Sequence, residues 1–96
     1  MFKRVAMWKL KGSVQKAQIL EMKRMLESLA INVGSTNSVE VGINASNSKS
    51  AYDIVFTVTF DGIVQLQEFE SDPYHKKVGE FVSELKESRV VVDYEL

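Results

Sequence analysis

The sequence predicts an α+β domain in which helices cover one face of a four-stranded antiparallel sheet. Two patterns favour it: apolar residues alternate with a period of two in four segments, and they recur at steps of three and four in the segments between them. Length is the third observation, because residues 1–96 allow a single small domain. Hydrophobic residues make up 45% of the chain and charged residues 26%, which indicates a folded globular domain.

Residues 2–10, FKRVAMWKL, are the first expected strand, with apolar side chains on both of its faces. A strand of this kind needs cover on both sides. Lys11-Gly12 ends it, and Ser13 is predicted to be the N-cap of a helix that runs from Val14 to about Ala30. The apolar stripe of this helix consists of Ile19, Met22, Leu26 and Leu29.

The middle of the chain predicts two further strands joined by a polar loop. Val39, Val41 and Ile43 alternate with polar residues or glycine, which is typical of a half-buried strand. The polar stretch 44–50 separates it from a strand at residues 52–60, in which every second side chain is large and apolar.

Three more elements follow in the last third of the chain. Asp61 is predicted to cap a short helix, and Asp72-Pro73 restarts a longer one, since an acidic N-cap followed by proline favours a helix start. The longer helix is expected to end near Glu87, and residues 89–96 form the final strand. The apolar residues of the short helix are Ile63, Leu66 and Phe69.

The resulting order, β-α-β-β-α-β, is the ferredoxin-like plan with a four-stranded antiparallel sheet. Its helices cover only one face of the sheet, and a contiguous apolar patch on the other face indicates an interface. We therefore expect two copies to stack these faces, which gives a homodimer that forms a dimeric α+β barrel. The residues expected on that face are Val39, Val41, Ile43, Val90, Val92 and Tyr94.

Composition excludes several classes of site and partner. The chain has no cysteine and one histidine, so we expect no disulfide, no metal site and no cofactor. The formal net charge of -1 lacks the basic excess of a nucleic-acid-binding protein. No apolar run approaches the length of a membrane span, and the N-terminus has no secretory signal, so we expect a cytoplasmic protein without a membrane partner.

Several stretches resemble the stress-responsive α/β-barrel domain family, also called the Dabb family. Lys3–Lys11, KRVAMWKLK, is similar to the family's opening strand, and Val39–Asn47, VEVGINASN, with Tyr52–Val55 resembles its second and third strands. Asp72–His75 looks like its helix start, and Val91–Tyr94 looks like its terminal VxDY strand. The resemblance implies a dimeric barrel of ferredoxin-like subunits. The family includes stress-induced plant proteins and a polyketide cyclase branch, so the fold alone does not imply one reaction.

The resemblance also implies candidate catalytic residues. His75 aligns with the general acid/base histidine of the cyclase branch, and Asp93 aligns with the aspartate that orients it. A carboxylate that accepts from one imidazole nitrogen fixes the tautomer and raises the basicity of the ring. The same hydrogen bond is equally a structural tie between helix and strand. Arg4 replaces a second histidine and Phe69 replaces a tyrosine of that branch, which argues against cyclase activity.

A small-molecule pocket is expected between the sheet and the helices, although the same residues would also form an ordinary filled core. An apolar lining with a few convergent polar groups is the usual form of such a site. The predicted lining is Arg4, Ala6, Trp8, Met22, Leu26, Phe56, Val58, Ile63 and Phe69, together with His75.

Three functions are compatible with the sequence. The first is a homodimeric protein that binds a small apolar or aromatic molecule in this pocket. The second is a lyase-like or cyclase-like enzyme in which His75 and Asp93 transfer a proton on a carbonyl or polyketide-like substrate. The third is a purely structural, stress-protective oligomer.

Overall fold

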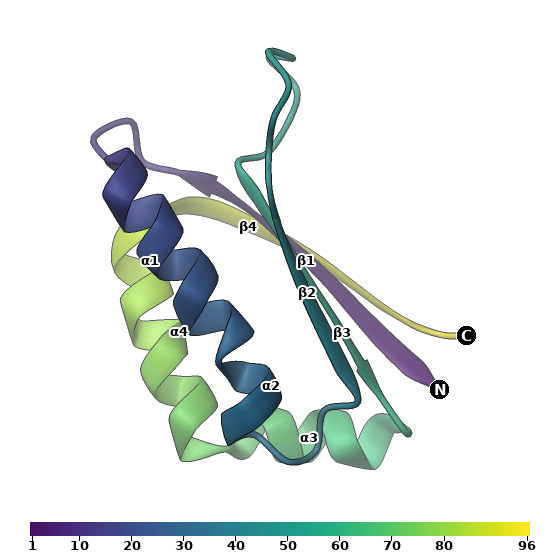
Figure 1. Cartoon of the computed structure of the whole chain (residues 1–96). Coiled ribbons are helices and arrows are strands. Elements are labelled where there is room, and N and C mark those ends of the chain that lie inside the picture. Colours follow the sequence, from purple (N-terminus) through teal and green to yellow (C-terminus); the bar gives the residue numbers. More distant parts are fainter.

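The computed structural model describes all of residues 1–96 and has the predicted order of elements (Figure 1). The elements are β1 (Phe2–Leu10), α1 (Lys16–Glu27), α2 (Leu29–Asn32), β2 (Ser38–Ile43), β3 (Ile54–Phe60), α3 (Ile63–Ser71), α4 (Pro73–Leu85) and β4 (Lys86–Glu95). The strands form one antiparallel sheet in the order β2-β3-β1-β4. The ferredoxin-like fold predicted from the sequence is therefore confirmed.

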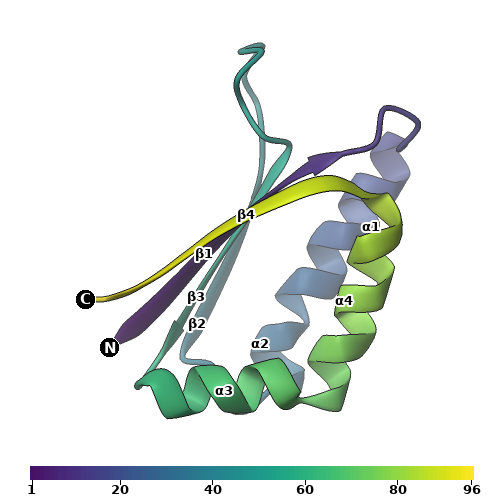
Figure 2. The ribbon, with the colours of Figure 1, turned by 180° about the vertical axis from the view of Figure 1, so that it is seen from behind.

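All the helices lie on one side of the sheet, and the other side is bare (Figures 1 and 2). α1 and α4 run side by side along the sheet, and α3 lies across one end of it (Figure 2). The core lies between these layers, where Ala6 and Trp8 of β1 meet Phe56 and Val58 of β3. Arg4 shares that face and is only 8% exposed, so a charge lies at the edge of the core. No helix has the length and apolar character needed to cross a membrane.

The first helical segment differs from the prediction at both ends. Ser13 is not its N-cap, because Gln15 takes that position and its backbone N–H donates to the Gln18 side chain at 2.7 Å in a capping box. α1 ends before Ser28, whose hydroxyl oxygen lies 2.6 Å from that of Tyr74 on α4. The single predicted helix is therefore two helices, α1 and α2.

The two acidic caps predicted for the second half have different outcomes. Asp72 caps α4 as predicted, since its Oδ1 accepts the backbone N–H groups of Tyr74 at 2.8 Å and His75 at 3.4 Å. Asp61 does not cap α3, because the glycine after it occupies the N-cap position. Asp61 instead accepts from the side chain of Asn37 at 2.7 Å, which ties the start of α3 to the start of β2.

β2 directs its apolar side chains toward the helices, so the prediction that they lie on the bare face is wrong. Val39 and Val41 are directly opposite Val58 and Phe56 of β3, and Ile43 continues the same alternation. Directly opposed residues of antiparallel strands share a face of the sheet. Because the β3 partners belong to the core, the β2 residues extend that core.

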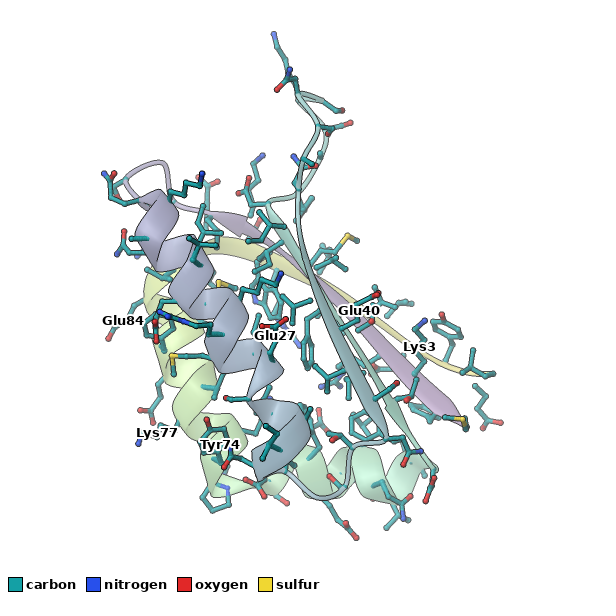
Figure 3. All side chains as sticks on the ribbon, viewed as in Figure 1. Lys3, Glu27, Glu40, Tyr74, Lys77 and Glu84 are labelled. Atoms are coloured by element: carbon teal, nitrogen blue, oxygen red, sulfur yellow. The ribbon has the colours of Figure 1, made fainter.

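The bare face carries an apolar strip along β4. Val90, Val92 and Tyr94 lie on it as predicted, with exposed fractions of 40%, 57% and 40%. Lys3 and Glu40 also point away from the helices (Figure 3). An exposed apolar strip beside charged residues is typical of an interface surface.

Candidate functional site

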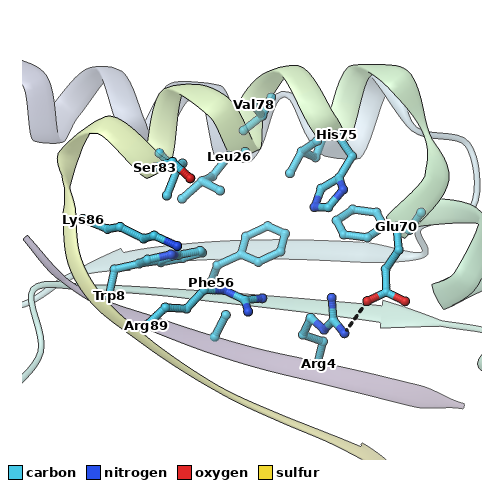
Figure 4. Close-up of a pocket in the computed structure, with 15 residues that line it drawn as sticks. Arg4, Trp8, Leu26, Phe56, Glu70, His75, Val78, Ser83, Lys86 and Arg89 are labelled. Atoms are coloured by element: carbon cyan, nitrogen blue, oxygen red, sulfur yellow. Dashed lines mark hydrogen bonds and ion pairs between the residues drawn. The ribbon is translucent and has the colours of Figure 1, made fainter.

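A cavity of about 360 Å³ lies between α4 and the sheet (Figure 4). Its lining comes from all four helices and from β1, β3 and β4. Apolar side chains form most of the interior, and charged or polar side chains from β1, α3, α4 and β4 complete it. The main apolar residues are Ala6, Leu26, Phe56, Phe69, Val78 and Val82.

Two small residues on opposite walls keep this space open. Ala6 lies on the floor between the larger Arg4 and Trp8 of the same strand face, and it is 1% exposed. Gly79 lies on α4 in the opposite wall, and a Cβ atom added there would meet no other atom within 4 Å. Glycine inside a helix costs about 1 kcal/mol relative to alanine. The helix therefore carries a less stable residue at the point where a side chain would project over the cavity.

Arg4 forms the polar end of the cavity. Its Nε donates to Asp93 Oδ1 at 2.8 Å, and its Nη2 donates to Asp93 Oδ2 and to Glu70 Oε2, both at 3.0 Å. The hydrogen bond with Asp93 raises the pKa of Arg4, and in turn lowers the pKa of Asp93. Two carboxylates thus hold one guanidinium in a fixed orientation, with the bidentate geometry that makes such pairs strong.

His75 lies in the first turn of α4, beside the polar end. Its ring centroid is 4.2 Å from that of Phe69, and its Nδ1 is buried without a hydrogen-bond partner in the chain. Burial, followed by the positive charge of Arg4, lowers the pKa of His75 below its ordinary value of 6.5. The N-terminal end of a helix disfavours a cation in the same way. The imidazole is therefore neutral at pH 7 and available to accept or share a proton.

The expected hydrogen bond between His75 and Asp93 is absent, and this prediction is wrong. Asp93 is directly opposite Arg4 in the β1–β4 register, so their side chains emerge on the same face at adjacent positions. Arg4 takes both carboxylate oxygens. Arg4 thus holds the aspartate, and His75 has no carboxylate partner.

Trp8 and two cations form the opposite end of the cavity (Figure 4). Arg89 lies opposite Trp8 in the strand register, with its guanidinium carbon 5.9 Å from the ring centroid. Lys86 lies at the junction of α4 and β4 and also lines the cavity. Trp8 is 5% exposed, and its Nε1 has no hydrogen-bond partner in the chain.

The structure brings most of the predicted site residues together around the cavity. Four of them do not line it: Asp93, which binds Arg4, and three that lie elsewhere. Met22 and Val58 are fully buried in the core away from the cavity, and Ile63 is 49% exposed on α3. Those lining the cavity are Arg4, Ala6, Trp8, Leu26, Phe56, Phe69 and His75.

Three charged residues of the lining were not predicted from the sequence: Glu70, Lys86 and Arg89. For Arg89 a signal was present, because the alternation that groups Val91 with Asp93 places Arg89 on the same face of β4. Glu70 and Lys86 lie at helix termini, where periodicity gives little indication of direction. No group of three or more histidine, aspartate and glutamate side chains is arranged to hold a metal ion.

Comparison with known protein families finds one that matches nearly the whole chain. A family model described as "Stress responsive A/B Barrel Domain" (Dabb) matches residues 2–96. No curated protein matches the chain. The match covers every element of the sheet and all the residues that line the cavity.

Solved structures share the fold over nearly the whole chain. A dimeric protein of unknown function with a ferredoxin-like fold from Bacteroides fragilis is 26% identical, with a TM-score of 0.82, and the match covers 99% of this chain and 95% of that one. A Dabb family protein from Mesorhizobium loti is 14% identical, with a TM-score of 0.83 and coverages of 99% and 95%. A hydroxynitrile lyase from Passiflora edulis is 13% identical, with a TM-score of 0.89 and coverages of 99% and 92%.

Proposed function

The chain belongs to the stress responsive A/B barrel domain family, and on that premise we propose that it is a homodimeric protein that binds a small apolar or aromatic molecule between sheet and helices. The cavity is the observation that carries this proposal. Its volume of about 360 Å³ falls in the range of about 300–1,000 Å³ typical of ligand pockets.

The cavity differs from ordinary core packing in two respects. Protein interiors are close-packed, so open space of about 360 Å³ between sheet and helices is unusual in a domain of 96 residues. Its lining also combines apolar side chains with a few polar ones, among them Arg4 and His75, which favours a molecule with polar groups on an apolar body.

A neutral fluorescent probe tests this proposal. 1-Aminoanthracene, whose emission rises in apolar surroundings, should bind the wild-type protein saturably with one site per chain. Gly79→Leu should abolish binding while the protein stays folded, because the new side chain enters free space over the cavity. Gly12→Leu is the matched control, since Gly12 is equally free of neighbours but lies in a turn outside the cavity. Equal binding by all three proteins would overturn the proposal.

The homodimer is proposed through the bare sheet face. Support comes from the exposed Val92 and its neighbours on β4, and from the Bacteroides fragilis protein, which shares the fold and is described as dimeric. Stacking two such faces would remove the apolar strip from water and complete a barrel.

A second candidate function is favoured by the state of His75. A neutral imidazole beside a fixed guanidinium can accept a proton from a carbonyl compound while Arg4 stabilises the developing negative charge. In this version Asp93 holds Arg4 and does not orient His75. His75→Gln with retained probe binding and lost turnover would support an enzyme; unchanged turnover of a candidate substrate would exclude His75 as its base.

A further inference from the structure

We propose that the ligand of the cavity is an anion, with an apolar or aromatic body and a carboxylate or similar acidic group that Arg89 and Lys86 hold at the Trp8 end. This inference rests on the proposed function, because it names the chemical class of ligand for the same cavity.

The charges around the cavity do not balance. Arg4, Lys86 and Arg89 are cationic, and Glu70 is the one carboxylate in the lining. Glu70 and the adjacent Asp93 both bind Arg4, and no carboxylate lies within 4.0 Å of Lys86 or Arg89. His75 adds no charge at pH 7, since burial lowers its pKa. Both acids therefore pair with Arg4, and they act on Arg89 only from a distance, so Lys86 and Arg89 have no carboxylate partner.

Of the two cations, Arg89 is expected to contribute more to the binding of an anion. The carbonyl groups at the C-terminus of α4 favour a positive charge at Lys86. Arg89 lies on β4, with its guanidinium over the face of Trp8 and no carboxylate within salt-bridge distance. Partial burial, followed by the charge of Arg4, lowers the pKa of Arg89, whereas Asp93 and Glu70 act in the opposite direction. An anion bound between Arg89 and Lys86 would relieve this repulsion, and the planar guanidinium suits a carboxylate.

The rest of the lining defines the body of the ligand. Figure 4 shows Lys86 and Arg89 extending along Trp8 at one end, with Phe56 in the middle and His75 at the other end. A flat apolar body with an acidic group would lie along Phe56 with its charge at Arg89 and Lys86.

Three naphthalene probes of similar shape and different charge separate the contribution of charge to binding from that of apolar contact. We would titrate the full chain at low ionic strength with 2-naphthoate, 2-naphthalenemethanol and 2-naphthylmethylammonium, by calorimetry. The expected order is the anion tightest and the cation weakest, with about a tenfold advantage of the anion over the alcohol, as for one hydrogen bond to a charged group. This advantage should shrink as salt is added.

Matched charge variants locate the effect. Arg89→Gln and Lys86→Gln should each lower the affinity for 2-naphthoate several times more than the affinity for the alcohol, and retained binding of the alcohol shows that the variants fold. Arg24→Gln is the control for arginine, because Arg24 is exposed on α1 and pairs with Glu21. Lys77→Gln is the control for lysine, because Lys77 points away from the sheet on α4 (Figure 3). Both controls should behave as wild type.

The outcomes distinguish this inference from the proposed function. If the alcohol binds as tightly as the anion, or if the controls lose the preference as much as the cavity variants do, the anionic class is wrong and the cavity remains a binding site. If none of the three probes binds, the proposed function fails and this inference fails with it.

Discussion

Arg4 decides the chemistry of the cavity at the residue scale. Its side chain is 10% exposed, and a buried charge is tolerated only when it is paired and hydrogen-bonded. Asp93 and Glu70 supply that pairing from two different elements. The same contacts leave His75 without a carboxylate. Arg4 is therefore the fixed cation of the cavity and also one reason that His75 is a neutral base.

The pKa of His75 tests this arrangement. Because His75 is the only histidine, one imidazole resonance reports it in an NMR titration. Burial and the Arg4 charge predict a pKa below 6.5 in the folded protein. The unfolded state then binds more protons, so the free energy of unfolding should be constant above about pH 7.5 and fall as the pH drops through 6.5 toward the folded pKa. A folded pKa at or above 6.5 would indicate a carboxylate partner and contradict the structure.

The residue types at the polar end were predictable, but their pairing was not. Arg4, His75 and Asp93 were all singled out from the sequence, and two of them line the cavity. Which side chain Asp93 binds depends on the β1–β4 register, which places it directly opposite Arg4. Alternation along a strand gives the face of a residue, whereas its partner across the ladder depends on a register that one strand alone does not specify.

At the scale of elements, α4 has a well-capped N-terminus and a glycine in its middle that lowers its helix propensity. Asp72 and Pro73 fix its N-terminus, and the sequence predicted this because both act locally. Gly79 weakens the helix where it passes over the cavity. The starts of α1 and α3 were predicted wrongly. Several polar residues precede α1, and the contact with Gln18 selects Gln15 among them, whereas Asp61 accepts from Asn37 and leaves Gly62 as the N-cap of α3.

Gly79→Ala measures the cost of keeping the cavity open. A methyl group there meets no atom within 4 Å, so the change should stabilise the protein by up to about 1 kcal/mol through helix propensity. Urea denaturation measures this directly, with the wild type as reference. A loss of stability would mean that the space over Gly79 is filled, against the structure.

At the scale of the whole molecule, the proposed dimer follows from the difference between the two faces of the sheet. One face holds the core and cavity, and the other exposes the apolar strip of β4. The sequence predicted this strip for Val90, Val92 and Tyr94, but it wrongly added the apolar residues of β2. Either face of the sheet could have held these residues until the β2–β3 register was known. The overall plan was nevertheless predictable, since it depends on the order of elements.

Val92→Glu tests the assembly. In the proposed dimer the new carboxylate would be buried without a partner in both subunits, which should raise the dissociation constant by about two orders of magnitude or more. Sedimentation velocity at micromolar concentration should show a dimer for the wild type and a monomer for the variant. Val64→Glu is the matched control, because Val64 is similarly exposed, at 55% against 57%, but lies on α3. A monomeric wild type, or equal effects of both variants, would rule out this interface.

The most direct test of the central claim is a crystal structure of the protein grown with 2-naphthoate. The account predicts one probe per chain between α4 and the sheet, with its ring against Phe56 and its carboxylate toward Arg89. A structure in which side chains close the space beneath Gly79, with the probe absent or bound only outside it, would contradict the claim that this fold encloses a ligand site.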